Sequence, residues 1–218
     1  MFQPHYEILS PSQNTLWPEL GGVPRYFVLY GGTALALRLG HRPSLDFDFF
    51  CSEPISPSEL LGELKCLKGG KVLQNVSQTL TVLVDRDGPV KLSFFANLTL
   101  GRVGVPDKSP DGILQVASLL DLAGTKAAVV TQRAESKDYR DILAILQSGI
   151  TLVQAMAAAK AIYGEQYNPM ITLKSLTYFG DGDLHKLSKE QQAQLVKAAS
   201  VKPAGLPEIS RVSEKLAA

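Results

Sequence analysis

The sequence has little excess charge, few cysteines and no long hydrophobic run. Its 22 basic and 21 acidic residues leave a formal net charge of +1, which excludes a strongly basic nucleic-acid binder recognisable from charge alone. Two cysteines, Cys51 and Cys66, cannot build a disulfide framework, and free thiols suit a reducing compartment, while a single bridge between them stays open. No uninterrupted apolar run reaches about eighteen residues, and residues 1–17 lack a basic stretch followed by an apolar core. We therefore predict a soluble, cytoplasmic chain without membrane contact.

The length and composition are those of an ordinary folded chain. Hydrophobic residues make up 45% and charged residues 20% of the 218 residues, which excludes wholesale disorder and suffices for a substantial apolar core. Residues 97–112 are rich in glycine, proline and aspartate, a composition typical of a boundary. We expect a core domain over residues 1–112 and a helical region over residues 113–218.

A strand, a tight turn and a helix are predicted around Gly31 and Gly32. Residues 26–30 form a short apolar and aromatic run of the kind that fills a buried strand. Thr33 can act as the N-cap of the following helix, and Gly40 can close it. At such a junction, glycines let a ligand approach the backbone, and free N–H groups with the helix dipole favour phosphate. The same glycines could also form a simple tight turn, and the local sequence leaves both interpretations open.

Two carboxylates follow on a strand with period-two alternation. In residues 45–49, Asp46 and Asp48 share one face and the apolar side chains share the other. Two carboxylates at this spacing can share Mg²⁺, which prefers hard oxygen ligands, although a solvated strand face would also carry acids. The strand is otherwise apolar, where unpaired charges are costly, and Arg38 and Arg42 between the glycines and the acids would complete a nucleotide site.

The rest of the chain predicts an α+β fold whose second half is helical. A helix is expected from Pro57 to about Leu67. Strands over residues 80–84 and 90–95 are joined by a segment with an Asp-Gly pair, a good hairpin signal. Capping residues predict further helices over residues 118–132, 136–147 and 151–163 and from Asn168 and Ser188, the last ended by Pro203.

Three charged residues lie on the apolar faces of these later helices. Lys126 shares an apolar stripe, so it either lays its stem across apolar surface or faces a cleft and meets an anion. Asp138 and Asp141 lie on the core side of the next helix. Salt bridges to Lys126 or Arg133 and a functional role are both open for these acids.

The segment from Gly31 to Phe50 resembles the signature of the nucleotidyltransferase superfamily, specifically its AbiEii/AbiGii toxin-like branch. It has a Gly-Gly pair, a spacer of thirteen residues between Gly32 and Asp46, and then Asp-x-Asp. Residues 121–126 and 137–141 look like the downstream lysine and the Asp-bearing helix of that branch.

The resemblance implies a nucleotidyltransferase-like small mixed sheet flanked by helices and followed by a C-terminal helical region. It implies Mg²⁺-dependent transfer of a nucleotide from a nucleoside triphosphate (NTP) to an acceptor hydroxyl, with release of pyrophosphate. In characterised toxins of the branch the acceptor is an RNA end, so RNA such as tRNA and an antitoxin protein are the expected partners.

The resemblance also implies a role for each candidate residue. Asp46 and Asp48 would hold Mg²⁺, and Lys126 would add positive charge. Asp141 or Asp138 is the candidate for orienting the acceptor hydroxyl. The residues expected to bind the nucleotide are Gly31, Gly32, Thr33, Arg42 and Ser44.

One position departs from the superfamily pattern. A following core strand carries a third carboxylate in the wider superfamily, where this chain places Ser93. Serine cannot replace that acid as a base at neutral pH. Either Asp138 or Asp141 therefore supplies the function, or the chain is a degenerate nucleotide-binding module that serves as a partner-binding or regulatory subunit.

An antibiotic-type small-molecule nucleotidyltransferase is a third interpretation, because an RNA acceptor normally profits from a basic surface. An RNA acceptor is favoured if five lysines cluster at the mouth of the site: Lys160, Lys174, Lys186, Lys189 and Lys197.

Overall fold

A computed structural model describes residues 2–201 and 205–218, which form two compact units. The first unit consists of residues 2–101, 105–118 and 213–218, and the second of residues 102–104, 119–201 and 205–212. The predicted helical region begins at residue 113, but residues 113–118 lie in the first unit because the strand at their centre joins its sheet.

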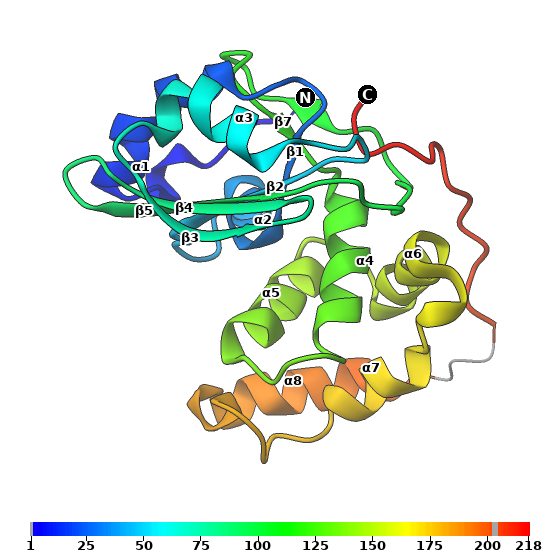
Figure 1. Cartoon of the computed structure of the whole chain (residues 1–218). Helices are drawn as coiled ribbons and strands as arrows, with labels where there is room; N and C mark the ends of the chain where they lie inside the picture. Colours follow the sequence, from blue (N-terminus) through cyan, green and yellow to red (C-terminus); the bar gives the residue numbers. More distant parts are fainter. Residues whose placement is uncertain (1, 202–204) are drawn as a thin grey trace. The chain divides into compact units, whose positions relative to one another are not determined.

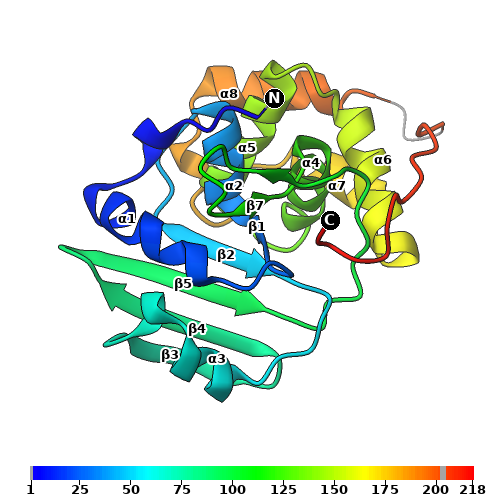
Figure 2. The same cartoon turned by 90° about the horizontal axis from the view of Figure 1, so that it is seen from above.

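The first unit is built on one seven-stranded mixed sheet with the strand order β3-β4-β5-β2-β1-β7-β6. Figure 2 shows β2, β5, β4 and β3 side by side. The pairs β1–β7 and β2–β5 are parallel and the other neighbours are antiparallel. The strands are β1 (Val28–Tyr30), β2 (Asp46–Phe50), β3 (Lys71–Val76), β4 (Thr79–Asp85), β5 (Pro89–Phe95), β6 (Asp107–Lys108) and β7 (Gln115–Val116). The predicted α+β class with a mixed sheet is confirmed.

One face of this sheet carries an aromatic core. Phe47 and Phe49 of β2 are fully buried, and the rings of Phe49 and Phe94 stack with centroids 5.1 Å apart. Because side chains alternate along a strand, Asp46 and Asp48 lie on the opposite face and are only partly buried, as their spacing predicts.

Short helices pack on the sheet of the first unit. Figure 1 shows α1 and α3 over one face of the sheet and α2 toward the other. The helices of this unit are the 3-10 turn η1 (Tyr6–Ile8), α1 (Pro11–Leu16), η2 (Trp17–Gly22), α2 (Gly31–Leu39), α3 (Pro57–Glu63) and η3 (Lys65–Leu67). The predicted helix from Pro57 therefore ends earlier, at Glu63, and a separate 3-10 turn covers the remainder; the edge strand β3 was not predicted at all.

The helix α2 begins earlier than the sequence predicts. Its N-cap is Tyr30, and Thr33 lies inside the first turn, where its hydroxyl donates a hydrogen bond to the backbone carbonyl of Asp46. The prediction that Thr33 caps this helix is therefore wrong, since its hydroxyl donates to a backbone carbonyl that is distant in the sequence. Gly40 ends the helix with a φ of +62°, as predicted for a C-terminal glycine.

The second unit is helical. It contains α4 (Leu119–Val129), α5 (Ser136–Gln147), α6 (Leu152–Tyr163), η4 (Gly164–Gln166), α7 (Pro169–Ser175), η5 (Leu184–Lys186) and α8 (Lys189–Ala199). Capping boxes at Thr151 and Ser188 and the side chain of Asn168 begin three of these helices, as their sequences predict. The end of α8 is followed by residues outside the described part of the chain, which include Pro203.

The start of α5 differs from its prediction. Ser136 is the first helical residue and not the N-cap, and its backbone N–H donates to Oδ1 of Asp183 at 2.5 Å. The Ser136 hydroxyl donates to the other oxygen of the same carboxylate at 3.0 Å. A residue distant in the sequence thus supplies the cap, which local pattern reading cannot find.

Within the described residues, no single helix is long and apolar enough to cross a membrane. The pair Ser136–Gln147 and Leu152–Gln166 meets the length and composition requirement only when both are taken together, and it is bent by 114°.

Candidate active site

The Gly31-Gly32 turn lies directly against several predicted site residues of the first unit. Gly31 has a φ of +73°, and a Cβ placed on it would lie 2.5 Å from Oδ2 of Asp48. A Cβ on Gly32 would lie 2.9 Å from Nη2 of Arg42 and 3.0 Å from Oγ of Ser44. The backbone conformation of Gly31 favours glycine, and the lack of a Cβ at both positions lets three polar side chains approach the backbone closely.

Strand pairing explains why these residues meet. The antiparallel pairing of β1 and β2 sets Tyr30 opposite Asp48, so the chain enters the glycine turn beside that carboxylate. The loop that carries Arg42 and Ser44 is bonded to helix α1, because Nε2 of Gln13 donates to the carbonyl of Ser44 at 2.8 Å. The buried amide of Gln13 thus positions the loop next to the turn.

Lys91 lies next to the paired carboxylates and was not identified from the sequence. The parallel register of β2 and β5 sets Asp46 opposite Lys91 and Asp48 opposite Ser93. The ammonium of Lys91 lies 2.8 Å from Oδ2 of Asp46, and both side chains are partly exposed. The alternation of β5 puts Lys91 on a definite face, but only the pairing of β2 with β5 brings it to Asp46.

The chemistry of this face fits a hard divalent cation completed by other ligands. Asp46 and Asp48 present carboxylate oxygens on one face of β2, and Mg²⁺ is commonly bound through one or two carboxylates together with substrate phosphates. No group of three or more His, Cys, Asp or Glu side chains in residues 2–201 and 205–218 could hold a metal ion.

Arg38 makes its contacts away from the glycine turn, contrary to its prediction. Its Nε donates to the carbonyl of Ala117 at 2.6 Å, and its Nη2 lies 2.8 Å from Oδ2 of Asp107. Its guanidinium also stacks on the ring of Phe2, 4.5 Å from the centroid. Arg38 thus joins α2 to the β6–β7 edge of the sheet, and the prediction that it serves the nucleotide is wrong.

The second unit holds the other three candidate residues in one buried ionic cluster. Nζ of Lys126 lies 2.7 Å from Oδ1 of Asp138 and 2.6 Å from Oδ2 of Asp141. The Lys126 side chain is 6% exposed, and those of both acids are 0% exposed. Nε of Arg133 lies 2.8 Å from Oδ2 of Asp138. The salt bridges that the sequence left open are therefore formed.

The cations of the cluster keep Asp138 ionised. Burial raises the pKa of Asp138, but hydrogen bonds from Arg133 and the charge of Lys126 outweigh it, so the pKa lies below its ordinary value. A carboxylate stabilised in this way is a weak base.

The two cysteines are not candidates for catalysis. Cys51 and Cys66 are free and buried. Burial raises the pKa of each thiol to about 11, so both thiols stay protonated at neutral pH and are poor nucleophiles.

The lysines proposed as an RNA-binding surface are not gathered at one pocket. Lys174 lines one pocket of the second unit and Lys197 lines another. Lys160 pairs with Glu165, and Lys186 pairs with Asp183. Lys189 is exposed at the start of α8.

A family model described as nucleotidyl transferase AbiEii toxin, type IV toxin–antitoxin system, matches residues 20–215. The chain belongs to the AbiEii nucleotidyltransferase toxin family. The match includes both the glycine turn with Asp46 and Asp48 and the Lys126 cluster, so the family pattern extends over both units. The predicted family and enzyme class are confirmed.

One sequence relative and two solved structures are similar to this AbiEii-family chain. An uncharacterised protein of Aquifex aeolicus (strain VF5) is 32% identical over 163 residues, which cover 73% of this chain and 77% of the relative. A protein from H. pylori, solved as a nucleotidyltransferase, superposes with a TM-score of 0.51 at 16% identity over 89% of this chain and 91% of the other. MenT4, a nucleotidyltransferase toxin of Mycobacterium tuberculosis H37Rv, superposes with a TM-score of 0.54 at 14% identity over 86% of this chain and 80% of the other. At these identities the two structures show a shared fold.

Proposed function

We propose that the chain transfers a nucleotide from an NTP to an acceptor hydroxyl, with Mg²⁺ at Asp46 and Asp48. The observation that carries the proposal is the packing of Gly31 against Asp48 and of Gly32 against Arg42 and Ser44. Three groups that a triphosphate requires therefore lie at one turn. They are a backbone that phosphate can approach, the cation of Arg42 and the carboxylate of Asp48.

The start of α2 would hold the phosphates. Gly31, Gly32 and Thr33 open this nine-residue helix, whose first N–H groups and dipole favour an anion. The guanidinium of Arg42 and the hydroxyl of Ser44, both beside Gly32, would add a charge and a donor. These groups would fix the triphosphate for attack on its α-phosphorus.

Asp48 would be the principal metal ligand, because it lies against the glycine turn while an oxygen of Asp46 is paired with Lys91. When bound, Mg²⁺ would neutralise the triphosphate and the departing pyrophosphate. The protein's part is to hold the phosphates and carboxylates in place, so catalysis rests chiefly on positioning and electrostatics.

The cluster of the second unit would serve the acceptor. Lys126 would hold Asp141 and Asp138 in place and supply positive charge. Asp141 or Asp138 is our candidate for orienting the acceptor hydroxyl, and the lowered pKa of Asp138 makes that carboxylate a weak base.

The family supports a toxin that is paired with an antitoxin, and we propose an RNA end, such as that of a tRNA, as the acceptor. The net charge of +1 favours a small-molecule acceptor as the second candidate. Ser93 opposite Asp48 favours a nucleotide-binding module without transfer as the third. The free cysteines agree with a cytoplasmic location.

The test is transfer of label from α-labelled NTPs in the presence of Mg²⁺ and total RNA. Wild type should label RNA, and Asp48→Asn should abolish labelling while its melting temperature stays close to that of wild type. Asp87→Asn is the matched control, because Asp87 lies in the β4–β5 turn with a φ of +59°, which asparagine tolerates. This variant should label RNA like wild type.

Three other outcomes would contradict the proposal. Labelling of added small-molecule alcohols but not RNA would assign the antibiotic-type activity. Nucleotide binding without transfer to RNA, protein or small molecules would assign the binding module. Undiminished transfer by Asp48→Asn would remove the metal assignment.

A further inference from the structure

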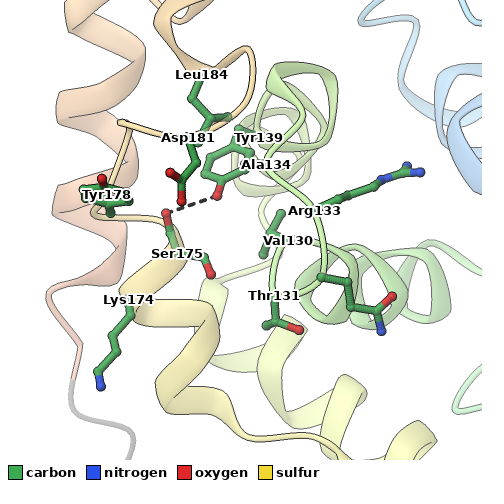
Figure 3. A pocket seen from close by; sticks show the side chains of 11 residues that line it. Val130, Thr131, Arg133, Ala134, Tyr139, Lys174, Ser175, Tyr178, Asp181 and Leu184 are labelled. Carbon is green, nitrogen blue, oxygen red and sulfur yellow. Dashed lines mark hydrogen bonds between the residues drawn. The ribbon is translucent and has the colours of Figure 1, made fainter.

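The second unit contains a cavity of about 380 Å³ that no step of the proposed transfer has used so far. Figure 3 shows its lining, which comes from the segment after α4, from α5, from the end of α7 and from the loop that follows α7. Its volume lies within the range of small-molecule sites, roughly 300–1,000 Å³. Its walls combine an aromatic ring, hydrogen-bonding groups and cations.

The aromatic wall is Tyr178, whose side chain is well exposed. The residue is 60% exposed although it is large and apolar over most of its surface. Its ring lies against Gly180, where a Cβ would be 2.6 Å from the Tyr178 hydroxyl oxygen. Its backbone N–H donates to the carbonyl of Ser175 at 3.4 Å, and the hydroxyl of Tyr139 donates to the same carbonyl at 3.2 Å (Figure 3). The backbone that carries the ring is thus held in place before any ligand binds.

The polar groups of the cavity suit the edge and sugar of a nucleotide. The hydroxyl of Tyr139 donates its one proton to Ser175, and its oxygen can still accept a hydrogen bond. The Asp181 carboxylate can accept hydrogen bonds from a base amino group or a ribose hydroxyl. The ammonium of Lys174, an exposed residue, can meet a phosphate.

The cavity is connected to the buried cluster of the same unit. Arg133 lines the cavity, and its guanidinium donates to both oxygens of Asp138, at 2.8 Å and 3.2 Å. Asp138 in turn accepts from Lys126 at 2.7 Å. A ligand in this cavity therefore lies one side chain away from the acids that we assign to the acceptor.

From this arrangement we infer that the cavity binds one unpaired nucleotide of the acceptor RNA, with its base stacked on Tyr178 and a phosphate at Lys174. The inference rests on the proposed function, because it gives the acceptor a site. An unpaired base needs one accessible aromatic face, which Tyr178 provides, and a cation for its phosphate, which Lys174 provides.

Fluorescence anisotropy with a short labelled single-stranded RNA tests the site. Base stacking is worth about 1–3 kcal/mol, so Tyr178→Ala should weaken binding roughly 5- to 150-fold, while Tyr178→Phe keeps the ring and should bind like wild type. Lys174→Ala should weaken binding and lower the slope of log K against log salt by about 0.7. Lys197→Ala is the matched control, an exposed lysine at another pocket of the same unit, and should change neither quantity.

Kinetics then separate this inference from the proposed function. Tyr178→Ala should raise KM for RNA and leave KM for the NTP unchanged, and Asp48→Asn should bind RNA like wild type without transfer. Wild-type RNA affinity in both Tyr178→Ala and Lys174→Ala would overturn the site, whatever the activity. Loss of RNA binding in Tyr178→Ala with no transfer by wild type would keep the site and overturn the transferase. Because both side chains are exposed, the variants should melt like wild type.

Discussion

Replacing Lys126 with methionine tests the central claim about the second unit, that one ammonium holds two buried acids. The side chain of Lys126 is 6% exposed and lies 2.7 Å and 2.6 Å from Asp138 and Asp141, each 0% exposed. Methionine keeps an unbranched stem and removes the charge. Asp138 would retain Arg133, whereas Asp141 would lose its bond to the ammonium.

The expected loss of stability is large because the variant removes the cation that contacts two buried acids. Removing one partner of a buried pair costs about 3–5 kcal/mol, against less than about 1 kcal/mol for an exposed pair. For a chain of this size the buried change corresponds to a fall of roughly 6–20 °C in Tm. Lys160→Met is the matched control, because the Lys160–Glu165 pair is exposed.

The assay is urea unfolding of wild type, Lys126→Met, Asp141→Asn and the double variant, at neutral pH and at acid pH. Removing the charge of Asp141 should recover part of the loss, so the double variant should be more stable than additivity allows by about 1 kcal/mol or more.

The acid side of the wild-type curve has the same origin. Since the pKa of Asp138 is lowered in the folded state, its stabilisation is fully present above the ordinary value of 3.8 and is lost as pH falls through the lowered value. A loss below about 1 kcal/mol in Lys126→Met at neutral pH, equal to that of Lys160→Met, would refute the reasoning.

Three further predictions concern single contacts. Gly31→Ala should abolish NTP binding in calorimetry, because its φ of +73° and the 2.5 Å approach to Asp48 exclude a Cβ. Gly62→Ala in α3, with open space around it, should bind NTP like wild type. Equal NTP binding by both variants would contradict the role of the glycine turn in binding the nucleotide. Lys91→Met should tighten divalent-cation binding with little change in Tm, since it frees the partly exposed carboxylate of Asp46. An unchanged affinity for the cation would show that the Lys91–Asp46 pair does not compete with the metal. Asp183→Ala should cost about 1 kcal/mol in urea unfolding by removing the cap of α5. The Ser136 N–H lowers the pKa of Asp183 to about 2, so that cost should be full above 3.8 and vanish as pH falls through about 2; a cost that persists there would exclude the charge as its origin.

Much of the fold was predictable where its cause is local. The alternation of β2 placed Asp46 and Asp48 on one face, and the capping boxes at Thr151 and Ser188 marked two helix starts. The hairpin between β4 and β5 followed from its Asp-Gly turn. In each case the residues that decide the structure lie within a few positions of one another.

Predictions failed where a side chain or a backbone group bonds to a residue that is distant in the sequence. Thr33 does not cap α2 because its hydroxyl donates to the carbonyl of Asp46, and Ser136 is itself capped by Asp183. Arg38 is drawn to Ala117 and Asp107, far along the chain. The strand β3 is exposed along its whole length and lacks the apolar alternation that marks a strand.

The sequence by itself determined the family, the glycine turn with its Asp-x-Asp strand, and the presence of a lysine and two acids on helix faces that also carry core residues. These depend on spacing along one chain, and spacing is read directly. Only the tertiary structure decided that Lys91 pairs with Asp46, that Lys126 joins Asp138 and Asp141 in one buried cluster, and that Tyr178 stands exposed at a cavity beside Arg133. Those contacts depend on which strands pair and which helices pack, and sequence spacing does not encode that choice.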